Sequence, residues 1–137
     1  MTRCHGLIYK LDFARRFTVK HAVILLGHGS QADGGNVALM DVARLIMDIG
    51  GVKVIPAYLQ FCEPSLPTAF NQAVGEGAGK VVVVPYFLYM GNHVSRDIPE
   101  ELDRLKAAHP GVEVVLTGHL DAHPKLAEIV LERIKGV

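Results

Sequence analysis

Four apolar runs alternate with four segments of helical periodicity, and this alternation limits the possible folds more than any other feature. The apolar runs cover residues 21–26, 52–59, 80–88 and 112–116. The third run contains the unbroken series Val81–Val84, which indicates a strand buried on both faces in the middle of a parallel sheet. Strands separated by helices are typical of βαβ units. The chain is therefore predicted to fold as an α/β protein with a four-unit, doubly wound parallel sheet of the flavodoxin-like type, βαβαβαβα.

The helical segments are recognised by apolar residues that recur every three or four positions. The first helix is predicted after the break at Asp33–Asn36, and the second at Glu63-Pro64-Ser65, with Pro64 in its first turn. Asp97-Ile98-Pro99 is predicted to open the third helix, and His123-Pro124 the last. The inward side chains of the last helix are expected to be Leu126, Ile129, Val130 and Ile134.

Length and charge exclude several classes of protein. The chain has 137 residues, enough for one domain with a core, and its 14 Lys and Arg balance its 14 Asp and Glu. Strong nucleic-acid binding is not expected at this charge balance, and no apolar stretch is long enough to span a membrane. Cys4 and Cys62 lack the spacing of a metal motif, so a reducing, cytoplasmic location is predicted.

Residues 1–20 differ from the rest of the chain because charged residues are scattered among apolar ones. Arg15-Arg16-Phe17 is similar to a twin-arginine export signal, but the apolar stretch that follows is too short for one. We expect residues 1–20 to form a loosely ordered N-terminal arm or an oligomer contact, and residues 21–137 to form a single domain.

Two histidines stand where predicted strands end. His28 lies in Gly27-His28-Gly29-Ser30 after the first run, and His93 lies in the segment after the third. Right-handed crossovers place all βα loops at one edge of the sheet, where ligands bind, and the first and third strands are usually neighbours. Imidazole binds borderline divalent metals and accepts protons near neutral pH. A metal or proton-transfer site is one interpretation; a pair of ordinary loop histidines is the other.

Other residues at this edge of the sheet are weaker candidates for the site. Glu63 can complete a metal site, accept a proton or orient a charged ligand, or it can simply favour a helix N-terminus. His119 and His123 flank the fourth strand-end loop and are secondary candidates. The segment Gly27–Ala32 fits a dinucleotide fingerprint formally, but Asp33-Gly34-Gly35 interrupts the helix that such a site requires.

Three segments together resemble a known family. They are Gly27–Ser30, Glu63-Pro64-Ser65-Leu66-Pro67 and Gly91-Asn92-His93-Val94-Ser95-Arg96-Asp97-Ile98-Pro99. They are similar to the small, single-domain sirohydrochlorin cobaltochelatases, which are class II tetrapyrrole chelatases. The similarity runs from about His21 to the C-terminus, and it implies the same four-unit α/β fold.

The resemblance also implies a reaction and residues for it. A divalent metal, Co²⁺ above all for cobalamin synthesis, would be inserted into sirohydrochlorin as a substrate, with no tightly bound cofactor. His28 would bind the metal and accept a pyrrole proton, and His93 would bind the metal. Substrate contacts would come from Glu63, Leu88, Tyr89, Met90, Gly91, Asn92 and His93. A homodimer is expected.

Three alternatives stay open at this point. The metal can be nickel or iron rather than cobalt, because imidazole ligands do not separate these ions. The protein can carry metal or tetrapyrrole without catalysis. It can also be an interaction domain with incidental histidines, which would bind neither.

Overall fold

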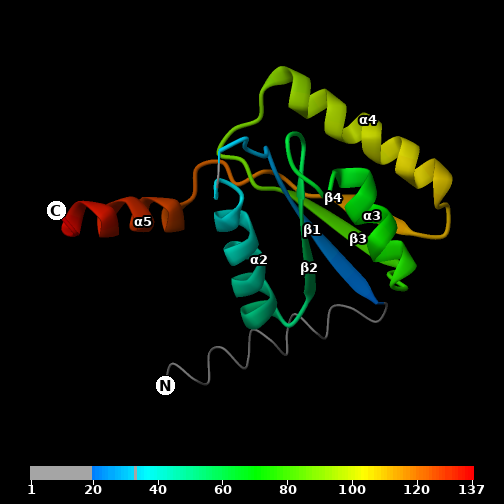
Figure 1. Cartoon of the computed structure of the whole chain (residues 1–137), viewed down its shortest axis with the longest axis horizontal. Coiled ribbons are helices and arrows are strands. Elements are labelled where there is room, and N and C mark those ends of the chain that lie inside the picture. The colour runs from blue at the N-terminus through cyan, green and yellow to red at the C-terminus, as the bar shows by residue number, and fades with distance from the viewer. Residues whose placement is uncertain (1–19, 33) are drawn as a thin grey trace.

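The computed structural model describes residues 20–32 and 34–137, and in them strands and helices alternate as predicted. The elements are β1 (His21–Gly27), α2 (Val37–Gly50), β2 (Lys53–Tyr58), α3 (Leu66–Gly75), β3 (Lys80–Pro85), α4 (Asn92–Ala108), β4 (Glu113–Leu116) and α5 (Pro124–Lys135). The four strands are parallel and lie in the order β2-β1-β3-β4. The predicted doubly wound α/β fold is confirmed (Figure 1).

β1 is one of the two interior strands of the sheet, in agreement with its apolar sequence. Ile24 pairs with Ile55 of β2 on one side and with Val83 of β3 on the other. The predicted neighbourhood of the first and third strands is thereby confirmed. Lys20, which precedes β1, accepts a hydrogen bond at its carbonyl from the amide of Gly79 (3.0 Å). The rest of the predicted arm, residues 1–19, lies outside the described residues.

One face of the sheet is covered by α3 and α4. Ile24 and Val83 from the strands pack there with Phe70 of α3 and with Ile98 and Leu102 of α4, and all are buried. Burial of such side chains stabilises a fold by roughly 1.5–3 kcal/mol each. This cluster therefore fixes α4, whose N-terminal half reaches the carboxyl edge of the sheet.

The opposite face carries a smaller core under α2. Leu39 and Ala43 of α2 pack against Val23 and Leu25 of β1 and against Val54 of β2. α2 lies across the sheet from α3 and α4 (Figure 1). Since α2 packs on β1 and β2, the helices of the described residues cover only part of this face.

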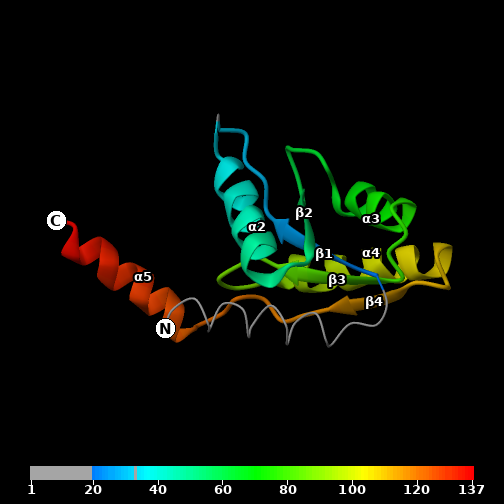
Figure 2. The same cartoon turned by 90° about the horizontal axis from the view of Figure 1, so that it is seen from below.

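The prediction that the last helix packs inward is wrong. No residue of α5 is buried, and both views show it extending away from the rest of the described chain (Figures 1 and 2). Leu126 is half-buried, whereas Ile129, Val130 and Ile134 are 46, 58 and 59% exposed. Helical periodicity identifies the apolar face of a helix but not the surface that covers it.

Two helices begin at other residues than predicted. α4 starts at Asn92 rather than Asp97, and Pro99 lies inside it. Proline in a helix interior removes one backbone hydrogen bond, but the burial of Ile98 and Leu102 holds the helix together. His93 consequently lies in the first turn of a helix instead of a loop.

α3 shows a smaller difference of the same kind. Its N-cap is Ser65, whose hydroxyl accepts a hydrogen bond from the Thr68 amide at 3.3 Å, and Pro67 rather than Pro64 occupies the first turn. Among the helices of residues 20–32 and 34–137, none is long and apolar enough to cross a membrane.

Candidate functional site

His28 follows β1 directly and lies at the carboxyl edge of the sheet. Its imidazole ring packs on the ring of Phe87, with the centroids 4.1 Å apart and the planes inclined by 31°. Phe87 belongs to the segment after β3 and is buried, whereas His28 is exposed. The pairing of β1 with β3 therefore gives the exposed imidazole a rigid aromatic support.

The turn that carries His28 is hydrogen-bonded to the segment after β2. The amides of Leu59 and Gln60 donate to the carbonyls of Gly27 (3.0 Å) and His28 (3.1 Å). Gly29 has φ +89°, and a Cβ at this position would lie 1.8 Å from the carbonyl oxygen of Gln60. Only glycine fits such a close approach in the left-handed region. Gly29 is thus a structural requirement of the turn.

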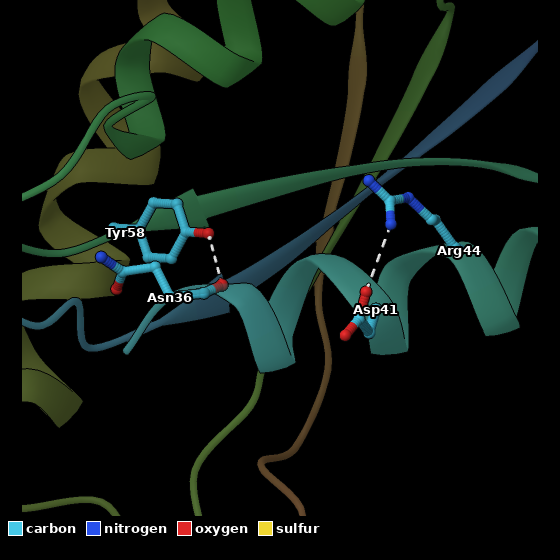
Figure 3. Close-up of polar contacts among 4 residues, drawn as sticks. All are labelled: Asn36, Asp41, Arg44 and Tyr58. Atoms are coloured by element: carbon cyan, nitrogen blue, oxygen red, sulfur yellow. Dashed lines mark hydrogen bonds and ion pairs between the residues drawn. The ribbon is translucent and has the colours of Figure 1, made fainter. Parts of the chain in front are cut away.

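Asn36 holds the turn from the α2 side. Its Oδ1 accepts from the Ser30 amide (3.0 Å), and its Nδ2 donates to the Ser30 carbonyl (3.1 Å). The Tyr58 hydroxyl donates to the Asn36 carbonyl at 3.2 Å (Figure 3). Burial, and secondarily the charge of Cys62, raise the pKa of Tyr58, so the phenol keeps its proton and remains a donor.

A cavity of about 410 Å³ lies beside His28. Its wall includes Asp97 and Glu101 of α4, which are one helical turn apart and share a face of that helix. The other lining residues are Tyr58, Leu59, Gln60, Ser65, Leu66, Pro67, Val94 and Ile98. One imidazole and two carboxylates at the same cavity can attract a cation and accept protons.

Sequence reasoning missed Asp97 and Glu101 as site residues. The spacing of four residues between them is visible in the sequence. The side of the helix on which they lie is not, because α4 was expected to begin only at Asp97. Once Ile98 and Leu102 are known to face the core, the two carboxylates between and beside them are placed at the sheet edge. Glu101 also forms an ion pair with Arg104, in which Oε2 and Nη1 are 2.5 Å apart, and the side chain of Arg104 is exposed.

Glu63 lies in an adjoining hollow of about 310 Å³, lined also by Phe61 and Cys62. The two hollows share Tyr58, Leu59, Gln60 and Ser65. The carboxylate of Glu63 accepts a hydrogen bond from the Ser65 amide at 2.8 Å. Glu63 therefore stabilises the start of α3, and its predicted contact with substrate stays a prediction.

His93 and the segment before it are presented differently from His28. His93 is exposed in the first turn of α4, next to Val94, which lines the cavity. None of the predicted contact residues Leu88, Tyr89, Met90, Gly91, Asn92 and His93 lines the cavity that contains His28. Within residues 20–32 and 34–137, no group of three or more His, Cys, Asp or Glu side chains is arranged to hold a metal ion. The predicted pair of metal ligands thus stays a prediction.

Apolar side chains stand exposed around the same edge. Leu88 and Tyr89 are 62 and 79% exposed, and Phe61 is 60% exposed after β2. Exposed aromatic and aliphatic side chains at the ligand-binding edge of a sheet are typical of binding surfaces. Of the secondary candidates, His123 accepts a hydrogen bond from the Lys125 amide (3.1 Å) and caps α5.

Comparisons with known proteins give one consistent result. The CbiX family model matches residues 22–137. A "Sirohydrochlorin cobaltochelatase" of Methanopyrus kandleri is 32% identical over 135 residues, covering 83% of this chain and 94% of that protein. The chloroplastic "Sirohydrochlorin ferrochelatase" of Arabidopsis thaliana is 32% identical over 114 residues, which are 82% of this chain but only 51% of that protein.

A solved structure agrees with these sequence relatives. It is a putative cobalamin biosynthesis CbiX protein from Marinobacter aquaeolei, with a TM-score of 0.72 and 33% identity. The similarity covers 85% of this chain and 95% of that one. The chain thus spans nearly the full length of two of these three proteins and about half of the plant relative.

Proposed function

The chain belongs to the CbiX family, and from this membership and the site we propose that it inserts a divalent metal ion into sirohydrochlorin. The observation that carries the proposal is the placement of His28 at the sheet edge, on Phe87 and in one cavity with Asp97 and Glu101. The names of the relatives, cobaltochelatase and ferrochelatase, support the same reaction.

The reaction replaces two pyrrole protons with one divalent metal ion, so the site must supply a base. We assign this role to His28, because imidazole accepts protons near neutral pH and because its ring is held in one place. His28 cannot use the same nitrogen for metal and proton at once. It therefore acts on them in sequence, or takes the proton through a water molecule.

The metal must be bound weakly enough to leave. We propose that it is first attracted to the cavity by Asp97 and Glu101 and then bound by His28 and His93. Two imidazoles without a third strong ligand hold borderline metals loosely, which suits transfer to the four nitrogens of the macrocycle.

The macrocycle has flat apolar faces and a rim of carboxylates. We propose that the exposed side chains of Leu88 and Tyr89 pack on a face of the ring, while Met90, Gly91, Asn92 and His93 follow its edge. Glu63 lies in the adjoining hollow, where it can orient the ring by repelling its carboxylates. With the ring on these exposed side chains, His28 and the cavity would lie beneath it.

Cobalt is our first choice of metal, as the resemblance to the small cobaltochelatases implies, and nickel and iron are the alternatives. A cytoplasmic homodimer without a tightly bound cofactor is expected on the same ground. Nothing in imidazole chemistry separates these metals, so rates must rank them.

The test is the anaerobic absorbance of sirohydrochlorin mixed with the protein and with Co²⁺, Fe²⁺ or Ni²⁺ in turn, against metal-only controls. We expect a spectral change that is faster with protein, and the order of rates identifies the preferred metal. Binding of sirohydrochlorin without faster insertion would support a carrier instead. If neither occurred, the proposal would be wrong.

A further inference from the structure

The imidazole of His28 is oriented by a ring contact and not by a hydrogen bond. In the part of the chain that the structure describes, no group forms a hydrogen bond with either nitrogen of this ring. Its packing partner is the ring of Phe87, with the centroids 4.1 Å apart. Aromatic pairs usually have their centroids about 4.5–7 Å apart, so these two rings are in close contact.

Two other histidines of the chain show the more usual arrangement. Nε2 of His109 is 3.1 Å from Oδ1 of Asn71, and Nδ1 of His123 accepts a hydrogen bond from the Lys125 amide at 3.1 Å. Each of these rings has one nitrogen occupied, which favours one position of the ring proton. The ring of His28 has a defined place in the fold without such a preference.

Phe87 is held firmly enough to support another ring. The amide of the preceding residue, Tyr86, donates to the Leu26 carbonyl (2.8 Å), and the carbonyl of Phe87 accepts from the Leu120 amide (3.0 Å). The side chain of Phe87 is 2% exposed and belongs to the core cluster that also contains Ile98 of α4. Its ring therefore keeps its position as long as the sheet edge and this core are intact.

A hydrogen bond and an aromatic contact have different effects on an imidazole. A hydrogen bond from the second ring nitrogen to a carboxylate or carbonyl orients a metal-binding histidine, fixes its tautomer and strengthens it as a ligand. An aromatic face orients the ring by packing and uses neither nitrogen. An imidazole that is held by an aromatic ring alone therefore stays a weaker ligand and keeps both nitrogens available.

We propose that Phe87 is a positioning residue that takes the place of this hydrogen bond, so that His28 serves first as a metal ligand and then as a base. The inference rests on the proposed metal insertion. The neutral imidazole binds the metal ion through one nitrogen. When the ion passes to the macrocycle, the lone pair of that nitrogen takes one of the two pyrrole protons, which leaves an imidazolium, and the second proton goes to water. A ring with a strong hydrogen-bond partner would hold the ion longer, and a ring without support would lose its orientation.

The first experiment measures the ring itself, by NMR of the unaltered chain without metal or macrocycle. The ¹⁵N shifts of the ring nitrogens are recorded at about pH 9, where a free imidazole is neutral. We expect both tautomers for His28 and the tautomer protonated at Nε2 for His123. The ring of His28 should nevertheless be as ordered as a rigid backbone, with an order parameter of about 0.85. A single tautomer of His28, or a mobile ring, would overturn the proposal.

The second experiment compares two matched variants. Phe87→Leu removes the ring beside His28. Phe70→Leu makes the same change in the same core cluster, where Phe70 packs on His109 with the centroids 5.5 Å apart. We expect both variants to lose stability. Only Phe87→Leu should lower the order parameter of the His28 ring below about 0.6 and reduce kcat by about 10–100-fold, with KM for sirohydrochlorin unchanged.

The two experiments separate this proposal from the proposed function. Equal kcat values for Phe87→Leu and Phe70→Leu would overturn the proposal, because Phe87 would then act only through stability. An unaltered chain that inserts no metal would contradict the reaction. The measurements on the His28 ring are made without metal or macrocycle, so they would still support or overturn its orientation by Phe87, and they do not depend on the folding of a variant.

Discussion

The two histidine-bearing segments differ in how firmly the fold holds them. The turn after β1 is fixed by hydrogen bonds from Leu59 and Gln60, by Asn36 and by the contact of His28 with Phe87. The segment after β3 leaves Leu88, Tyr89 and His93 exposed. The difference indicates that the two segments have different tasks. In the proposed reaction, the base needs one position, whereas the surface proposed to bind the macrocycle needs accessible side chains that adapt to it.

The largest effect is expected from His28→Ala. Loss of a positioned general base lowers rates by about 10²–10⁴-fold, and we expect the insertion rate to fall in this range. The fold should persist because His28 is exposed. Insertion rate and thermal midpoint are measured together, with His109→Gln, at the opposite end of the sheet, as a control of unchanged rate. A His28→Ala protein of full activity would remove His28 from the mechanism.

Gly29→Ala should be the most destabilising single change in the turn. The added Cβ would meet the Gln60 carbonyl at 1.8 Å in a left-handed conformation, which we expect to cost about 2–4 kcal/mol. Gly34→Ala is the matched control, because Gly34 also has a positive φ but no heavy atom within 4 Å of its Cβ position. It should cost about 1 kcal/mol. Equal losses in urea unfolding would show that the close approach to Gln60 is not a constraint.

Asn36→Ala removes both side-chain hydrogen bonds to Ser30. We expect a loss of about 1–2 kcal/mol in the free energy of unfolding, together with a lower insertion rate, because the turn under His28 loosens. Asp41→Ala breaks an exposed ion pair with Arg44 on the same helix (Figure 3) and should change stability by less than about 0.5 kcal/mol. An insertion rate that is unaffected by Asn36→Ala would mean that the turn needs no such support.

Tyr89→Ala tests the accessible segment. Its side chain is 79% exposed, so stability should change by less than about 0.5 kcal/mol. KM for sirohydrochlorin should rise by up to about tenfold, equivalent to about 1.4 kcal/mol of binding. Leu45→Ala, an exposed apolar position of α2, should leave KM unchanged. A fall in kcat at constant KM would instead assign Tyr89 to the chemical step.

The smallest effect concerns the pH dependence of Tyr58. Its pKa is raised above the ordinary 10.0 in the folded chain, so its contribution to stability is complete below about pH 10 and is lost as the pH rises through the folded pKa. Tyr58→Phe should lose about 1 kcal/mol at neutral pH with the hydrogen bond to Asn36, and its stability should fall less between pH 9 and pH 11. Urea midpoints at several pH values measure both, and an unchanged alkaline slope would contradict this interpretation.

The strands were predictable because apolar side chains on both faces of the sheet leave unbroken apolar runs, although of the four valines in β3 only Val81 and Val83 are buried and Val82 and Val84 are half-buried. Val81–Val84 is an example, because four consecutive β-branched residues favour a strand over a helix. The start of α4 was not predictable. Proline is common in the first turn of a helix, so Pro99 indicated a start near Asp97, and the burial of Ile98 and Leu102 is not visible in the sequence. The orientation of α5 was not predictable either. The apolar face of this helix indicates that it packs on an apolar surface, but it does not identify that surface.

The site was predictable in part for similar reasons. His28 follows an apolar strand in a glycine turn, and the parallel topology fixes the edge to which it belongs. Asp97 and Glu101 become neighbours of His28 only through the packing of α4 on the sheet, which local sequence does not encode. The two hydrogen bonds between Asn36 and Ser30, one donated by each residue, connect positions six apart in a loop whose form the sequence does not specify.

The most direct test of catalysis at the sheet edge that carries His28 is a multiple-turnover time course under anaerobic conditions. Sirohydrochlorin and Co²⁺ are both in large excess over the protein. We predict that the unaltered protein converts all of the sirohydrochlorin to the metallated product faster than the metal-only control, and that His28→Ala, shown to be folded, follows the control. Conversion that stops at one equivalent per protein chain, or equal progress by His28→Ala, would contradict catalysis at this edge.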